Sequence, residues 1–237
     1  MNRYTLPLIA GLGAVIGAGA VWSYDRFAAP NGPDQARIER VVHDYVLAHP
    51  EIIPQAMQKL QEQQSGQAVA ANRQDIETPF GSAWAGNPKG DVTLVEYFDY
   101  NCGYCRASLP MIADLIKRDP NLRVVYRDLP ILSDESRTAA RASLAAAQQG
   151  KFAAFHDALY AGGPVSDASI QAAATKTGVA LNGLQSPVIT AEIAKNMQTA
   201  VKLGMNGTPS WVVGDRILSG ALPIEELEKE IAAARGR

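Results

Sequence analysis

Only two cysteines occur in the chain, and two residues separate them in the motif Cys-Gly-Tyr-Cys at 102–105. Two thiols exclude a fold held together by several disulfides, and they exclude a four-cysteine zinc site. The three histidines, His43, His49 and His156, show no spacing that would complete a zinc site with this pair. The thiol chemistry of the chain is therefore concentrated at one point.

The residues on either side of the motif predict where the two thiols lie. Val92–Phe98 has the pattern of a buried strand, and Ala107–Arg118 that of a helix. A cysteine at the start of a helix is close to free backbone N–H groups and to the positive end of the helix dipole, which favour the thiolate. We therefore expect Cys102 to be the nucleophile. Cys105 lies one turn further on, where it can resolve a mixed disulfide.

An acidic residue precedes the motif within the predicted strand. Glu96 lies six residues before Cys102, and we expect its side chain beneath the active site. A buried carboxylate there would have a raised pKa and could accept the proton of Cys105 during resolution. The alternative interpretation is a carboxylate exposed on the strand.

Thr208-Pro209 stands directly before another predicted strand. A proline at this place indicates either a cis peptide bond or an ordinary trans turn. A cis bond would leave the Thr208 backbone free to pair with an extended substrate.

Composition places the chain among globular proteins. It has 237 residues, a formal net charge of −2, 47% hydrophobic residues and 19% charged residues. This hydrophobic content is enough for a core, and the length predicts one domain with an appendage or two small domains. A dedicated nucleic-acid-binding protein would normally carry a basic excess, so no nucleic acid partner is expected.

The order of elements from Asp91 onward predicts an α/β fold. A strand, a helix and a strand are followed by helices, then by a hairpin and a last helix, which is thioredoxin architecture with an inserted helical domain. After the first strand and helix, the predicted elements are a strand at Leu122–Tyr126, helical segments at 133–161 and 167–203, strands at Ser210–Val213 and Arg216–Ser219 joined at Gly214-Asp215, and a helix from Pro223 to Arg235.

The N-terminus has the pattern of an export signal or a membrane anchor. Residues 4–24 carry no charged side chain and follow Arg3. Ala18-Gly19-Ala20 would suit cleavage, whereas Trp22 and Tyr24 would suit an interfacial anchor. We favour the uncleaved anchor, with a buried soluble helix as the alternative. Whether the segment is an export signal or an anchor, the rest of the chain is expected in the periplasm. Only an uncleaved segment 4–24 would tether it to the inner membrane.

Between this segment and the main domain lies a helical arm. From Asp34 to Gln64 apolar residues recur at spacings of three and four, with Pro50 and Pro54 interrupting, and the pattern ends in the polar run 61–66. So short a segment has no core of its own, so its stripe must pack against the main domain or against other copies of the chain. The stripe consists of Ile38, Val41, Val42, Tyr45, Ile53, Met57 and Leu60.

The predicted boundaries follow from these patterns. They are 1–26 for the signal peptide or anchor, 27–66 for the linker and helical oligomerisation arm, 67–90 for a connecting segment, 91–132 and 191–237 for the two parts of the thioredoxin fold, and 133–190 for the inserted helical domain.

The motifs together resemble the DsbA-like thiol-disulfide oxidoreductases of the thioredoxin superfamily. The resemblance lies in the strand 92–98 leading into 99–105, in 129–132 and in Gly207-Thr208-Pro209, and it extends from about Asp34 to the C-terminus. The chain is most similar to the ScsC subgroup, which is associated with suppression of copper sensitivity. Its segment 48–52 resembles the ScsC segment that drives oligomerisation.

This resemblance implies how the site is built. Pro209 is expected to be cis, with Cys102, Cys105, Thr208 and Pro209 lining one surface, and the position of Glu96 also carries an acid in the family. DsbA, an oxidase, has Pro-His between its cysteines and a valine before the cis-proline. Here Gly103-Tyr104 and Thr208 are instead similar to the isomerase DsbC.

Three functions follow as hypotheses. The first is a periplasmic disulfide isomerase or reductase that acts on unfolded or misoxidised proteins, is kept reduced by a membrane thiol reductase, and forms a homo-oligomer, a trimer before a dimer. The second is a dithiol oxidase. The third is a copper(I)-binding protein in copper tolerance that uses the Cys102 and Cys105 thiolates, since soft sulfur ligands suit Cu(I). Apart from copper, the only redox group expected is the Cys102–Cys105 disulfide.

Overall fold

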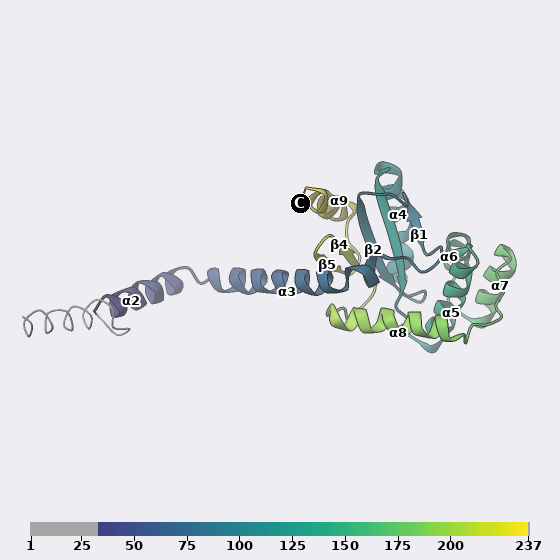
Figure 1. The fold of residues 1–237 in the computed structure, drawn as a ribbon, viewed down its shortest axis with the longest axis horizontal. Helices are drawn as coiled ribbons and strands as arrows, with labels where there is room; N and C mark the ends of the chain where they lie inside the picture. The colour runs from purple at the N-terminus through teal and green to yellow at the C-terminus, as the bar shows by residue number, and fades with distance from the viewer. Residues whose placement is uncertain (1–32, 237) are drawn as a thin grey trace, which may run out of the picture. The chain divides into compact units, whose positions relative to one another are not determined.

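The computed structural model describes residues 33–236, so the predicted signal or anchor at 1–26 lies outside the described residues (Figure 1). Within this range no helix is long and apolar enough to cross a membrane. The chain divides between Leu60 and Gln61 into two units. The first holds α2 (Pro33–Ala48) and the start of α3 (Ile52–Glu77), and the second holds the rest of α3 and all the strands.

The second unit is built on a five-stranded sheet in the order β1-β3-β2-β4-β5. Strands β2 and β3 are parallel, whereas β1, β4 and β5 each join the sheet antiparallel. The elements are β1 (Trp84–Gly86), β2 (Val92–Phe98), α4 (Gly103–Arg118), β3 (Leu122–Asp128), α5 (Asp134–Gln148), α6 (Phe152–Ala161), α7 (Asp167–Thr177), α8 (Pro187–Lys202), β4 (Ser210–Val213), β5 (Arg216–Ser219) and α9 (Ile224–Arg235).

This arrangement confirms the thioredoxin fold with an inserted helical domain. The predicted strands β2, β4 and β5 have the bounds that the sequence indicated, and α5, α6 and α7 stand between β3 and α8. Helix α4 begins earlier than predicted, directly after Cys102. The predicted helical segment 133–161 is interrupted at 149–151, where Gly150 has a φ of 73°, a left-handed conformation that glycine adopts without strain.

Two buried clusters lie on the two faces of the sheet, because successive residues of a strand point to opposite sides. On one face Leu94 and Phe98 of β2 pack with Ile112 of α4 and with α5, α6, α7 and α9. On the other face Val95 and Tyr97 pack with α8 and with the end of α3.

Helix α3 is longer than the sequence predicted. The polar run 61–66 does not end it, and the helix continues to Glu77, through the first part of what was predicted to be a connecting segment at 67–90. Glutamine and glutamate are good helix formers, and Val69 and Ile76 are buried against the sheet, so packing extends the helix past Gly66. Pro54 does not interrupt it either, since proline is tolerated in the first turn, where the N–H has no helical partner.

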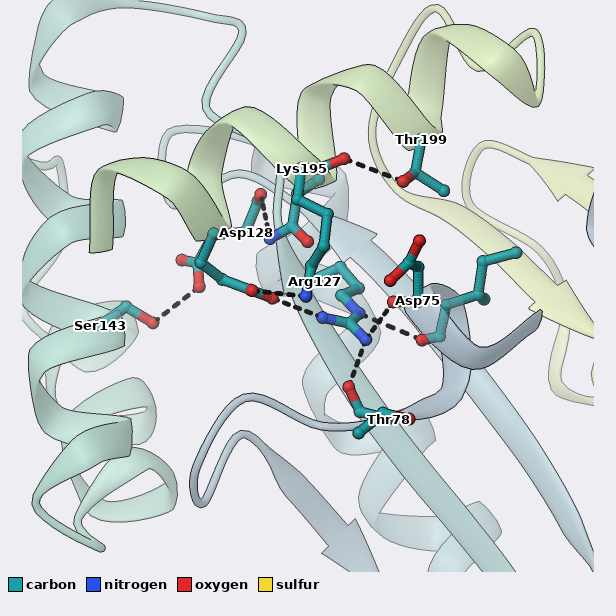
Figure 2. A network of polar contacts seen from close by, with 10 residues as sticks. Asp75, Thr78, Arg127, Asp128, Ser143, Lys195 and Thr199 are labelled. Carbon is teal, nitrogen blue, oxygen red and sulfur yellow. Dashed lines mark hydrogen bonds and ion pairs between the residues drawn. The ribbon is translucent and has the colours of Figure 1, made fainter. Parts of the chain in front are cut away.

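A buried arginine holds the end of α3 to the sheet. Arg127 of β3 donates to the backbone carbonyls of Asp75, Ile76 and Thr78 (Figure 2). It also pairs with Glu192 of α8 at 2.6 Å, and Glu192 in turn pairs with Lys195. The carbonyls at a helix end have no partners within the helix, so this side chain closes α3 against β3 and α8.

Candidate active site

The two cysteines lie at the start of α4, as the sequence predicted. Cys102 is the N-cap, and its Sγ accepts a hydrogen bond from the Cys105 backbone N–H at 3.3 Å. Only 6% of Cys102 and 1% of Cys105 is exposed to solvent. The first sulfur is therefore at the edge of the surface and the second lies beneath it.

The loop before β4 completes this surface. The Thr208-Pro209 peptide bond is cis, in agreement with the family resemblance, and the Cys102 thiol lies 3.2 Å from the Thr208 carbonyl oxygen, to which it donates. The structure thus brings Cys102 and Thr208 together across 106 residues of sequence. Thr208 Oγ1 is buried and has no hydrogen-bond partner among the described residues.

The residues between the cysteines face outward. Tyr104 is 68% exposed, and a Cβ atom added at Gly103 would meet nothing within 4 Å. The approach to Cys102 is therefore open, and Tyr104 offers an aromatic surface beside it. Ile131 and Leu132, which follow β3, are also exposed.

Asp99 is a site residue that the sequence reasoning did not single out. Its backbone carbonyl accepts from the Cys102 N–H, and its carboxylate accepts from the N–H groups of Asn101, Ile131 and Leu132. It ties the loop that carries the nucleophile to the loop after β3. The available signal was an aspartate directly after a buried strand, a residue type that often caps a turn with its own side chain.

Glu96 is buried beneath the site, as predicted. It is 1% exposed, lies opposite Tyr126 of β3 and Trp211 of β4, and its Oε1 has no partner among the described residues. Burial, and to a smaller extent the negative charge of Cys102, raise the pKa of Glu96 to about 8. This carboxyl group therefore changes protonation near neutral pH.

Cys105 has the properties of a thiol that needs a base. Burial is the main cause that raises the pKa of Cys105 far above its usual value, and the negative charge of Glu96 adds to it. A thiol so buried reacts only when its proton is removed as it attacks.

No three metal-ligating side chains lie together in the described part of the chain. A copper(I) site here would have two sulfur ligands, and the copper hypothesis stays a prediction from the resemblance.

Comparison with known families agrees with this geometry. Residues 93–232 match the model of the DSBA-like thioredoxin domain. The chain belongs to this family. Residues 34–67 also match the N-terminal domain of the copper resistance protein ScsC, which covers the predicted oligomerisation arm.

Solved structures place the chain among thioredoxin-like oxidoreductases. A thioredoxin-like oxidoreductase from Silicibacter pomeroyi is 44% identical, with a TM-score of 0.66, over 70% of this chain and 99% of that one. A linker-deletion mutant of Proteus mirabilis ScsC is 25% identical, with a TM-score of 0.70, over 87% and 97%. These matches support a thioredoxin-like thiol-disulfide oxidoreductase fold for the DSBA-like chain.

A curated Na(+)/H(+) antiporter from Salinispora arenicola is 30% identical over 156 residues, 63% of this chain. The chain spans only about a quarter of the length of that antiporter, 24%, so the match concerns one part of it.

Proposed function

We propose that the protein is a disulfide isomerase or reductase that acts on misoxidised proteins through Cys102 and Cys105. The observation that carries the proposal is the pairing of two unlike thiols. Cys102 lies at a helix start and within reach of the Thr208 carbonyl, whereas Cys105 is buried above Glu96. This division suits an attacking thiol and a resolving thiol.

In the first step the Cys102 thiolate attacks a substrate disulfide, forms a mixed disulfide and releases one substrate thiolate. The proton of Cys105 then moves to the Glu96 carboxylate, and the Cys105 thiolate attacks Cys102 Sγ. The second substrate thiolate leaves, and the Cys102–Cys105 disulfide forms. An isomerase also needs a second route, in which another thiolate of the substrate attacks the substrate sulfur of the mixed disulfide, forms a new substrate disulfide and releases the Cys102 thiolate.

The residues around Cys102 support an isomerase or reductase rather than an oxidase. Thr208 precedes the cis-proline and Gly103-Tyr104 separate the cysteines, which is similar to DsbC and unlike the oxidase DsbA. A reduced dithiol is needed for this role, so a membrane thiol reductase is the partner we propose. Export to the periplasm is part of the same proposal and is supported by the uncharged segment 4–24.

The arm supports a homo-oligomer, with a trimer as the proposed state and a dimer as the alternative. In the first unit the predicted stripe is exposed, including Ile38, Val41 and Tyr45 of α2 and Met57 of α3. Burial of one such side chain is worth about 1.5–3 kcal/mol, so several copies could hold a symmetric bundle together. Several sites around one cavity would suit the reshuffling of a misfolded client.

Trapping tests the division of labour between the thiols. Cys105→Ser is expected to accumulate mixed disulfides with misoxidised client proteins, because Cys102 can still attack the client disulfide whereas the resolving thiol is missing. Cys102→Ser is expected to accumulate none. Equal trapping by both variants would contradict the assignment.

Two charged variants of the full chain test the oligomer. Val41→Asp with Tyr45→Asp places charges in the stripe, and Ala36→Asp with Arg40→Asp places them at the same spacing on the opposite face of α2. Light scattering is expected to show a lower mass for the first pair alone. That pair should also lose refolding of a scrambled client while it keeps simple thiol exchange. A parent protein that is already monomeric, or one that oxidises clients without reshuffling them, would favour the oxidase hypothesis.

A further inference from the structure

A chain of hydrogen bonds runs through the core from the end of β3 to an imidazole on α6. Tyr100 OH donates to Ser143 Oγ at 3.1 Å. Ser143 in turn donates to Asp128 Oδ2 at 3.2 Å (Figure 2). Tyr100 OH also lies 3.1 Å from His156 Nδ1. Since the hydroxyl proton of Tyr100 is already used, Nδ1–H is the donor in this last bond, and the lone pair of the imidazole is at Nε2.

The imidazole of His156 is enclosed and neutral. His156 is 3% exposed, and burial lowers its pKa to about 3. Its Nε2 is buried without a partner among the described residues. An orphaned acceptor in a core is costly, so its presence calls for an explanation. The rings with centroids 4.9–5.5 Å from the imidazole belong to Phe98, Tyr100, Tyr126, Phe152 and Tyr160.

Glu96 belongs to the same aromatic cluster. It points to the same side of β2 as Phe98, two residues on, and it lies opposite Tyr126 of β3. The rings of Phe98 and Tyr126 both have centroids 5.0 Å from the imidazole of His156. Glu96, whose Oε1 is orphaned, and His156, whose Nε2 is orphaned, therefore both lie beside the rings of Phe98 and Tyr126.

We propose that His156, Tyr100, Ser143 and Asp128 form a proton relay that exchanges a proton with Glu96 through a buried water molecule, and so restores Glu96 as the base for Cys105. The relay rests on the proposed function, in which Cys105 is the resolving thiol. These four are positioning residues, because they act on the thiol through Glu96.

The transfer balances without any electron donor or acceptor. A proton from Glu96 arrives at Nε2, the Nδ1 proton moves to Tyr100, the Tyr100 proton moves to Ser143, and the Ser143 proton moves to Asp128 Oδ2. Glu96 becomes a carboxylate and Asp128 becomes a carboxylic acid. Burial raises the pKa of Asp128 well above its usual value, as it does for Glu96, so the two carboxyl groups compete for one proton.

The surroundings favour the retention of that proton. Most of the neighbouring groups are acids, which become negative when they ionise. The exception is Arg106 of α4, whose guanidinium lies 5.8 Å from the centroid of the Tyr160 ring, while Arg127 points to the opposite face of the sheet. These acids are Cys102 and Cys105 at the start of α4, Asp99 after β2, Tyr126 on β3, Asp157 and Tyr160 on α6, and Glu192 on α8.

Stopped-flow oxidation of the full reduced chain by dithionitrobenzoate separates the two thiol steps. The first thionitrobenzoate is released when Cys102 attacks the reagent. The second is released when Cys105 attacks the mixed disulfide and the Cys102–Cys105 bond forms. Only the second step needs Glu96 as a base.

Tyr100→Phe and Ser143→Ala each cut the relay and leave His156 in place. We expect the second release to slow about tenfold at pH 7 in each variant, while the first release is unchanged. In these variants the rate of the second release should recover above about pH 8, where Glu96 loses its proton to solvent. The double variant should be no slower than either single variant, because a relay is broken only once.

Tyr97→Phe is the matched control. It removes a hydroxyl that is equally buried on the opposite face of β2 and has no partner among the described residues. Both releases should be unchanged. His156→Phe cuts the relay at the end next to Glu96. This variant replaces Tyr100→Phe or Ser143→Ala in the test if either of them does not fold.

The relay proposal is overturned if the folded variants show the same pH profile of the second release as the parent protein. It is also overturned if the decreases in rate of the two single variants add in the double variant. Failure of the proposed function looks different, since the parent protein itself would then show no second release.

Discussion

The two faces of the sheet treat buried ionisable groups in opposite ways. On the face that α3 and α8 cover, Arg127 is buried and its guanidinium binds Glu192 and three backbone carbonyls. On the face that α4 and α6 cover, Glu96 and His156 are equally buried, yet each has an atom without a partner in the described chain. Tyr126 and Arg127 are adjacent in β3, so one strand separates the two environments.

This difference separates a structural role from a chemical one. A buried charge with all its partners stays ionised and holds elements together, and it is costly to break. A buried titratable group without partners has a displaced pKa, which is a property of functional sites, and the displacement brings the pKa of Glu96 near neutral pH. The predictions below are ordered by the size of the effect expected on each face.

Loss of Arg127 is expected to have the largest effect. Arg127→Met leaves the buried Glu192 without one of its two cationic partners and three carbonyls without this donor, so the free energy of unfolding should fall by about 3–5 kcal/mol. Urea unfolding measures it. Arg123→Met makes the same change on the same face of β3, where the arginine is only partly buried and donates to Thr93. It should cost less than about 1 kcal/mol. Equal losses would show that the partners of Arg127 are not the cause.

Glu96→Gln is expected to change how stability depends on pH. Native Glu96 keeps its proton up to about pH 8, whereas in the unfolded chain it is lost near pH 4.5. The unfolded state therefore binds fewer protons between these values, so the stability of the parent should fall as pH rises, by on the order of 4 kcal/mol. The variant should lack this loss when urea unfolding is compared at both ends of the window. A parent and variant with parallel pH curves would contradict the burial of an orphaned carboxyl.

His156→Phe is expected to have the opposite dependence on pH. The pKa of His156 is lowered from 6.5 to about 3 in the native state, so below pH 6.5 the unfolded state binds more protons and stability falls with pH. Relative to pH 7, the parent should lose about 2 kcal/mol at pH 5 through this group, and the variant should not. The number of protons taken up on unfolding, measured by calorimetry in two buffers, checks this. An unchanged uptake would show that the imidazole is not kept neutral.

Thr208→Val is expected to have the smallest effect. It removes the orphaned hydroxyl beside Cys102 and keeps the volume of the side chain. We expect the redox potential of the dithiol to shift. The kcat/KM for refolding of a scrambled client should fall by an amount equivalent to about 1 kcal/mol, and the rate of simple thiol exchange should fall by less. Equilibration against glutathione and a refolding assay measure the two. An unchanged refolding rate would remove Thr208 from the residues that set the direction of exchange.

The sequence by itself determined the local parts of this protein. Strand β2, a helix after the motif, and the hairpin of β4 and β5 follow from patterns within about ten residues of the motif or of a turn, whereas the pattern left Glu96 either buried or exposed. Such patterns are reliable where side-chain periodicity and a cap or turn residue agree.

The tertiary structure decided which distant side chains meet. Tyr100, Ser143 and His156 come from a loop and two helices and meet only because α5 and α6 pack on β2 and β3. The strand β1 and the extension of α3 to Glu77 likewise depend on partners, Val125 for Trp84 and Arg127 for the helix end. No short segment encodes these contacts, since each is stabilised only after the chain has brought together residues that are tens of positions apart.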